Sequence, residues 1–416
     1  MGCGGTRRQP AQGNGRQITS MAQNKIRIVL GSNGFWKLHV GVEETAKTAT
    51  DGGSPYVGGK KDAMTTDTTS GRIPMPNHWV PRFVSAGVPY EDMRDLLQRI
   101  DTWDIWCREW SAKGAAHEQL GEAALTEGRL VTAGQAFHSA AVCYHFAGFR
   151  FYEDMSQKHQ ADRKARECYG KSAPYMRPPA ERFSVPFQGE NLVCYLRLPV
   201  GVSRAPCVIT IAGMDSRKEE FHELENEFLY RGMATVSYDG PGQGEVWHHL
   251  KMRYDGEKAT IAIMDYLAGR PEIDDGRIGI YGWAMGGYVA PRVAAVDRRV
   301  KACVSMPIRY KLEDWDGLGS AATGAYQHLF GDVSYEEGRQ IAAQFTLEGV
   351  LPRVQCPYLI VHGGRGFAVS QSEADQAARE AGGSAKLVVF EEGDHLCLNV
   401  RHESWPLMMD WFAEQL

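Results

Sequence analysis

The residues with the clearest chemical pattern are Gly282, Ala284 and Gly286, which form a Gly-x-Ala-x-Gly motif. The preceding residues 277–281 have the composition of a strand, and residues 288–295 form a good helix opening. In the strand–elbow–helix turn of serine hydrolases the motif is G-x-S-x-G, and a strained turn lifts the serine oxygen above the sheet. Alanine has no oxygen with which to attack a carbonyl. The chain as written therefore cannot form an acyl-enzyme at position 284.

Two explanations of Ala284 are open. One is a deliberate Ser→Ala replacement that leaves a bound substrate unreacted, because the surrounding elbow keeps the hydrolase form. The other is a natural protein that does not use serine chemistry. A third interpretation of the motif is that its glycines only make a tight turn between a strand and a helix.

A candidate general base, His395, follows the last expected strand, where α/β-hydrolases keep their catalytic histidine. The orienting acid is missing, because Gly366 stands where an aspartate is expected after the seventh strand. A histidine without that carboxylate loses control of its tautomer, which costs about 10⁴ in turnover in a worked case. Asp314 and Asp316, after the sixth strand, could supply a carboxylate, or could simply be charged lid surface.

Backbone donors do not depend on the side chain at position 284. In this fold the oxyanion hole uses one N–H from the loop after the third strand and one from the residue after the nucleophile. These would be Met214 and Met285, and each such donor is worth roughly 2.7–4 kcal/mol in a transition state. Candidate substrate contacts nearby are Asp215, Glu245, His248 and Trp283. The sequence contains no convincing metal ligand set, and we expect neither a metal nor a cofactor.

The composition of the 416 residues, 43% hydrophobic and 23% charged, is that of an ordinary globular chain with room for a large α/β domain and a smaller one. A net charge of −5 gives no reason to expect nucleic acid or an anionic membrane as a partner. The nine cysteines are scattered without a C-x-x-C pair, which indicates reduced thiols in a cytoplasmic protein. No apolar run approaches the roughly 20 residues of a membrane span.

The pattern divides the chain into three parts. Residues 1–76 are rich in small and polar types and should form a loose arm, in part pinned to the body. Residues 77–176 have helical spacing and predict a cap of four or five helices. Residues 177–416 alternate strands with helices, which indicates a mostly parallel sheet with a lid insertion at about 307–355. We expect eight strands, at 183–187, 192–198, 207–212, 234–238, 278–281, 301–305, 358–361 and 387–390.

These motifs resemble one group of α/β-hydrolases. The segments 213–220, 231–235, 239–245, the elbow and Gly393-Asp394-His395 are similar to 2,6-dihydroxypseudooxynicotine hydrolase, fungal pyrone hydrolases and fermentation-respiration switch proteins. The resemblance runs from about residue 79 to 416 and implies an α/β-hydrolase fold with an amino-terminal helical cap. It also implies that position 284 is the nucleophile, His395 the base and position 366 the acid.

The resemblance implies hydrolysis of a C–C bond next to a ketone, or of an ester or lactone, in an aromatic or polyketide-like small molecule. With Ala284 we expect that hydrolysis to be negligible. One alternative is a lyase, cyclase or decarboxylase that uses His395 and the oxyanion hole, and another is a ligand-binding pseudoenzyme. We expect a homodimer with a small-molecule partner.

Overall fold

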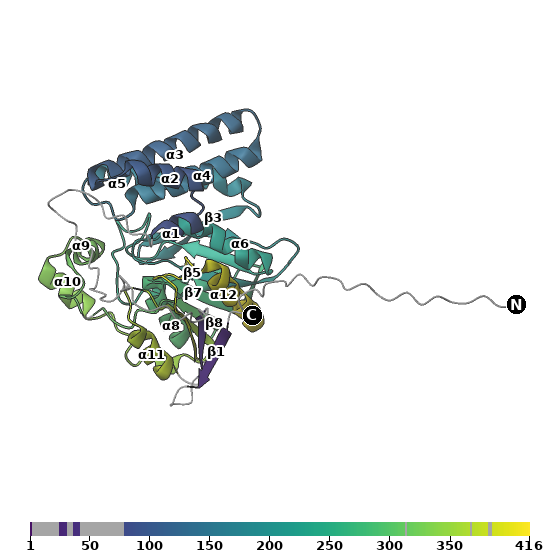
Figure 1. Ribbon diagram of the computed structural model, residues 1–416, viewed down its shortest axis with the longest axis vertical. Coiled ribbons are helices and arrows are strands. Elements are labelled where there is room, and N and C mark those ends of the chain that lie inside the picture. Colours follow the sequence, from purple (N-terminus) through teal and green to yellow (C-terminus); the bar gives the residue numbers. More distant parts are fainter. Residues whose placement is uncertain (2–24, 31–35, 42–78, 313, 367, 382–384) are drawn as a thin grey trace.

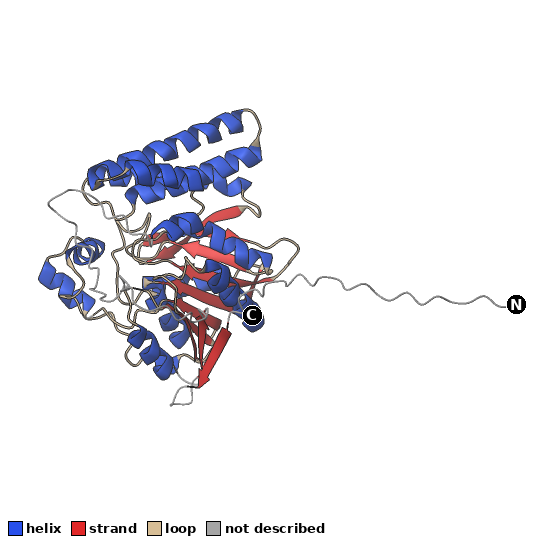
Figure 2. Cartoon of the chain, viewed as in Figure 1, coloured by secondary structure: helices blue, strands red, loops and turns tan. Residues whose placement is uncertain are grey.

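The computed structural model describes Met1 and residues 25–30, 36–41, 79–312, 314–366, 368–381 and 385–416 (Figure 1). Most of the expected arm therefore lies outside the described residues. A layer of helices lies over one end of a broad twisted sheet, and further helices flank the sheet (Figure 2). Among the described residues, no helix combines the length and the apolar character needed to cross a bilayer.

The cap is formed by five helices, as the spacing predicts. They are α1 (Trp79–Ser85), α2 (Tyr90–Arg99), α3 (Trp103–Thr126), α4 (Leu130–Gly148) and α5 (Met155–Ser172), followed by the short η1 (Ala173–Tyr175). Gly128, with φ of 72°, makes the turn between the two long antiparallel helices α3 and α4. Asp154 caps α5, because its carboxylate accepts hydrogen bonds from the N–H groups of Ser156 and Gln157.

Three tryptophans of α3, Trp103, Trp106 and Trp110, form a stripe at helical spacing that belongs to the cap core. Trp106 and Trp110 are fully buried and pack against Phe83 and Phe146, and the indole N–H of Trp106 donates to the carbonyl of Phe146 at 2.8 Å. Small residues allow the helices to approach, since a Cβ on Gly121 would lie 2.7 Å from the ring of Phe137. The stripe thus stabilises the cap and does not form a ligand box.

All eight expected strands are present in the sheet. They are β3 (Ala180–Phe187), β4 (Glu190–Arg197), β5 (Ala205–Ile211), β6 (Ala234–Tyr238), β7 (Ile273–Trp283), β8 (Val300–Met306), β9 (Tyr358–Gly363) and β10 (Ala385–Phe390). Strands β5 to β10 pair in parallel, and β3 and β4 form an antiparallel hairpin. Gln188 and Gly189 turn that hairpin with positive φ at both positions, as a two-residue hairpin requires.

Two strands extend the sheet beyond this expectation. β1 (Lys25–Leu30) and β2 (Trp36–Gly41) form a hairpin, and β2 pairs in parallel with β10. The described strands therefore follow the order β1-β2-β10-β9-β8-β7-β5-β6-β4-β3. This part of the arm is pinned to the sheet through backbone hydrogen bonds.

Helices cover both faces of the sheet. Residues of α6 (His222–Tyr230) and α12 (Arg401–Gln415) share one apolar cluster with the strands. Residues of α7 (Glu257–Leu267), α8 (Met285–Val296) and α11 (Gln371–Glu380) share the other. The short η2 (Lys218–Phe221) leads into α6, and η3 (Leu351–Arg353) precedes β9. The lid segment between β8 and β9 contains α9 (Ser320–Leu329) and α10 (Tyr335–Ala342), which lie to one side of the sheet (Figure 1).

Candidate active site

The elbow between β7 and α8 holds Ala284 in a strained conformation, with φ of 52° and ψ of −113°. Positive φ is uncommon for a residue with a Cβ, and such strain gathers at functional sites. The glycines are required by space: a Cβ on Gly282 would lie 2.1 Å from the carbonyl oxygen of Gly286, and one on Gly286 would lie 2.0 Å from that of Ile211. The chain thus builds a strained strand–helix elbow around a side chain that has no nucleophilic atom.

The loop after β5 lies directly beside this elbow. A Cβ built on Gly213 would be 3.2 Å from the Cβ of Ala284. The side-chain amide of Gln243 donates to the carbonyls of Ala212 at 2.9 Å and of Gly213 at 2.6 Å. The Gly213 carbonyl and the Met214 N–H belong to one trans peptide unit, so they point in opposite directions. Gln243 therefore fixes the direction of the Met214 N–H.

The cap is anchored to this loop by Arg82 of α1. Its guanidinium contacts Glu220 at 2.5 and 2.8 Å, Asp215 at 3.0 Å and the hydroxyl of Ser216 at 2.7 Å. Burial acts to raise the pKa of Glu220, but the adjacent Arg82 lowers it to about 2. The indole N–H of Trp283 donates to the same Ser216 hydroxyl at 3.0 Å. Arg82 thus joins the cap, the loop after β5 and the elbow, and the sequence analysis missed it.

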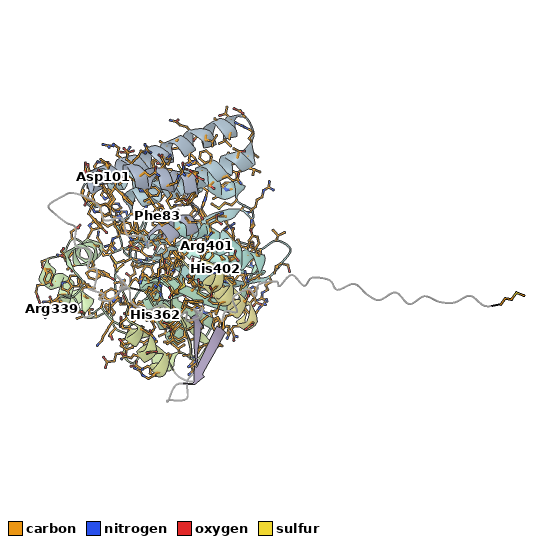
Figure 3. The ribbon with its side chains drawn as sticks, viewed as in Figure 1. Phe83, Asp101, Arg339, His362, Arg401 and His402 are labelled. Atoms are coloured by element: carbon orange, nitrogen blue, oxygen red, sulfur yellow. The ribbon has the colours of Figure 1, made fainter. Side chains whose placement is uncertain are left out.

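Position 366 lies beside His395. A Cβ on Gly366 would be 3.5 Å from the Cα of His395, but glycine supplies no carboxylate there. The His395 loop is held by Asp394, whose carboxylate accepts from the N–H groups of Leu396 at 3.0 Å and Leu398 at 2.9 Å. A different histidine, His362, is buried in β9. It lies in the sheet domain, away from the cap, which contains Phe83 (Figure 3).

The two alternative acids lie in the lid. Asp316 accepts a hydrogen bond from the hydroxyl of Tyr335 at 2.6 Å. The carboxylate of Asp314 folds over its own turn, where a Cβ on Gly317 would meet it at 2.3 Å. The neighbouring Glu313 lies outside the described residues. An orienting role for Asp314 or Asp316 stays a prediction.

A pocket lies between the cap, the loops after β5 and β6, and the lid, and encloses about 480 Å³ including its open mouth. Met214 and Asp215 form part of its wall, together with Trp247 and His328. Of the other expected contacts, Trp283 is buried beneath the loop, and His248 is exposed beside His159 with their ring centroids 5.0 Å apart. The structure places Trp247, not His248, on the wall, a distinction that two adjacent aromatic residues do not reveal in sequence. Met285 follows the elbow and is buried.

Glu245 belongs to a buried charge cluster around Lys218. The ammonium of Lys218 lies 2.5 Å from Asp239, 2.7 Å from Glu219 and 2.8 Å from Glu245. Within the described part of the chain, these three carboxylates form the one group close enough together to hold a metal ion, and Lys218 lies among them. Burial acts to raise the pKa of Asp239, but Lys218 lowers it. The cluster stiffens the turn after β6, which carries Gln243.

The sheet order, the elbow after β7 and the histidine loop after β10 define a protein of the α/β-hydrolase class. The family described as "Esterase FrsA-like" matches residues 100–314, and the prolyl oligopeptidase family matches residues 220–416. The chain belongs to the FrsA-like esterase family.

Individual relatives agree with this assignment. The 2,6-dihydropseudooxynicotine hydrolase of Paenarthrobacter nicotinovorans is 34% identical over 340 residues, which cover 80% of this chain and 91% of that protein. The crystal structure of 2,6-dihydroxy-pseudo-oxynicotine hydrolase superposes with a TM-score of 0.76 at 32% identity, over 81% of this chain and 95% of that one. Hydrolyase poxO of Penicillium oxalicum is 29% identical over 52% of this chain and 54% of its own length. The resemblance drawn from the motifs is confirmed.

Proposed function

We propose that this protein binds an aromatic or polyketide-like ketone in the pocket under the cap, and that its serine form hydrolyses a C–C bond next to the ketone, or an ester or lactone. Position 284 would carry the nucleophile, His395 would act as base, and the N–H groups of Met214 and Met285 would stabilise the oxyanion. With Ala284 the chain would bind this substrate without cleaving it.

The observation that carries this proposal is the strained backbone of Ala284. A plain strand–helix turn does not require positive φ at a residue with a Cβ, whereas a nucleophile elbow does. The adjacent loop, pinned by Gln243, supports the same proposal, because its donors remain aimed without any nucleophile. The hydrolases found among the relatives support the reaction class.

The experiment is hydrolysis by the Ala284→Ser variant, with a β-diketone, an aryl ketone and a short-chain aryl ester as substrates. Acid release should rise by several orders of magnitude over the Ala284 protein, since loss of a triad serine costs about 2 × 10⁶ in one worked case. Ala284→Gly is the matched control, because it changes the same residue without adding an oxygen. If the serine variant is as inert as the glycine variant on every substrate, the proposal is wrong.

A second candidate is a lyase, cyclase or decarboxylase that stabilises an enolate with His395 and the same donors. The observation that favours it is the joint loss of two side chains, since position 366 has no carboxylate and position 284 no hydroxyl. A C–C bond-forming or CO₂-releasing reaction of the Ala284 protein that is lost in His395→Ala would support this candidate. If the Ala284 protein binds ketones but transforms none, a pseudoenzyme is the better description.

Two further proposals concern the protein's setting. We propose a homodimer, which the mass from light scattering would test, and a cytoplasmic location. The location is consistent with the described cysteines, which are all free thiols.

A further inference from the structure

Arg150 has an unusual backbone for its residue type. It follows α4 in the loop to α5 with φ of 51°. A left-handed residue just beyond a helix is usually glycine or asparagine, because a larger side chain is strained there. A strained residue of this kind is a reason to look for a function.

The neighbours of Arg150 fix its loop from both sides. The ring of Phe149 is buried, and the guanidinium carbon of Arg82 lies 4.5 Å from its centre. Phe151 is buried in the cap core. Between these two anchors, Arg150 lines the pocket.

The guanidinium of Arg150 keeps most of its hydrogen-bonding capacity. Its side chain is 17% exposed, and its one ion pair among the described residues is with Asp215 at 3.5 Å, a distance at the limit for a hydrogen bond. Asp215 is already engaged by Arg82 at 3.0 Å. An arginine has five N–H donors, so several remain for a molecule in the pocket.

The charges around the pocket are unbalanced. Of the charged side chains that line it, Arg150, Lys158 and Arg217 are cationic and Asp162 and Asp215 are anionic. Lys158 contacts Asp162 at 3.9 Å, but Asp162 is also bound by Arg217. Burial lowers the pKa of Lys158, as expected for a buried cation that shares its counter-ion. A bound anion would supply the missing charge.

Part of the pocket wall is aromatic. The ring of His328 lies 4.5 Å from that of Trp247 and 5.6 Å from that of Tyr152, measured between centroids. All three residues line the pocket. A flat conjugated ligand would stack on this wall with its acidic group toward the cationic side.

We propose that the pocket selects substrates that carry one negatively charged oxygen on their aromatic or conjugated part, and that Arg150 binds this oxygen. The proposal rests on the proposed function, which supplies the ketone-containing remainder of the substrate. Arginine suits the role because its planar guanidinium holds a carboxylate or phenolate through charge-assisted hydrogen bonds.

The test is calorimetric binding to the Ala284 protein, which needs no turnover. The probes are 4-acetylbenzoate, its neutral methyl ester, and 4-hydroxyacetophenone measured below and above the ionisation of its phenol. At least one ionised probe should bind about tenfold or more tightly than the neutral probes, as one charge-assisted hydrogen bond provides. Preference for 4-acetylbenzoate alone identifies a carboxylate, and affinity that rises as the phenol ionises identifies a phenolate.

Arg150→Gly separates binding from folding. Glycine relieves the strain, so the melting temperature should not fall. The Kd of the ionised probe should rise to within about threefold of the Kd of the neutral probes. Affinity for the methyl ester should be unchanged. Gln188→Gly is the matched control, because it relieves a similar φ of 53° in a turn away from the pocket and should keep the preference.

The proposal is overturned if the unaltered protein binds the neutral probes as well as the ionised ones, or binds no ionised probe. It is also overturned if Arg150→Gly keeps the preference for the ionised probe, or lowers the affinity for ionised and neutral probes equally. Because no step of this test involves hydrolysis, an inert Ala284→Ser variant would count against the proposed function alone.

Discussion

The side-chain amide of Gln243 lies 2.6 Å from the carbonyl oxygen of Gly213, and this contact sets the direction of the next N–H, that of Met214. The carbonyl of Gln243's own side chain accepts from the Gly240 N–H at 2.9 Å, so the amide cannot rotate freely. A side chain from one loop thus prepares a backbone donor in another. The Gly213 carbonyl also accepts a longer hydrogen bond from the N–H of Ser216, at 3.3 Å.

Gln243→Glu should therefore lower turnover in the Ala284→Ser background. A carboxylate keeps the size of the side chain but cannot donate to Gly213, and loss of one oxyanion donor costs about 10²–10³ in kcat in a worked case. The KM should change little, because the donor acts mainly in the transition state. Steady-state kinetics would check this. A rise in KM with unchanged kcat would show that Gln243 serves substrate binding and not the donor.

Ala284→Gly should raise the free energy of unfolding. Relief of a strained φ is worth of order 1–3 kcal/mol, and it should exceed the roughly 0.5–1 kcal/mol that glycine costs by its chain entropy. Urea denaturation at fixed pH measures the difference. A lower stability would mean that the elbow is not strained at this residue.

Arg82→Met should strongly destabilise the junction of cap and sheet. Removal of one partner from a buried ion pair costs about 3–5 kcal/mol, because Glu220 would be left uncompensated. The double variant Arg82→Met/Glu220→Gln should recover part of this loss. Denaturant unfolding of the two variants gives both values, and the absence of any recovery would show that Arg82 contributes through packing alone.

Acid should remove the contribution of Glu220 in a defined range. Its folded pKa is about 2, against an ordinary value of 4.5, so its contribution is fully present above about pH 4.5 and is lost as the pH falls towards 2. The difference in free energy of unfolding between the unaltered protein and Glu220→Gln should be constant at higher pH and should decrease below pH 4.5. A gap that is independent of pH would contradict the ion pair.

The sheet was largely predictable, because each of its eight core strands is a short apolar run between turn signals. The hairpin of β1 and β2 is only half indicated by the sequence, since residues 26–30 form a short apolar run while residues 36–41 merely alternate. The contact of β2 with β10 joins residues about 350 positions apart, and no local pattern reports such a pairing.

The positions of residues that follow strands were predictable, as at Met214, Ala284 and His395. Arg82 was not, because a single arginine in a helix looks like any solvated cation until its partners, more than 130 residues away, are known. Arg150 was hidden for a related reason. Its strained φ is a property of the backbone, and the sequence shows only an ordinary residue after a helix.

Repair of the acid should add to repair of the nucleophile. Gly366 lies beside His395, so Gly366→Asp in the Ala284→Ser background should raise kcat if no other carboxylate orients the histidine. Asp314→Asn and Asp316→Asn in the Ala284→Ser protein are the companion variants. If either of them abolishes activity while Gly366→Asp adds nothing, the lid supplies the acid.

The central claim is that the elbow at position 284 is complete except for its oxygen. The most direct measurement is the intact mass of the Ala284→Ser protein quenched during reaction with an aryl ester, followed by mapping of the modified peptide. The account predicts an acyl adduct on residue 284 of the serine variant and none on the Ala284 protein treated in the same way. An unmodified residue 284 in a folded protein that binds the ester would contradict it.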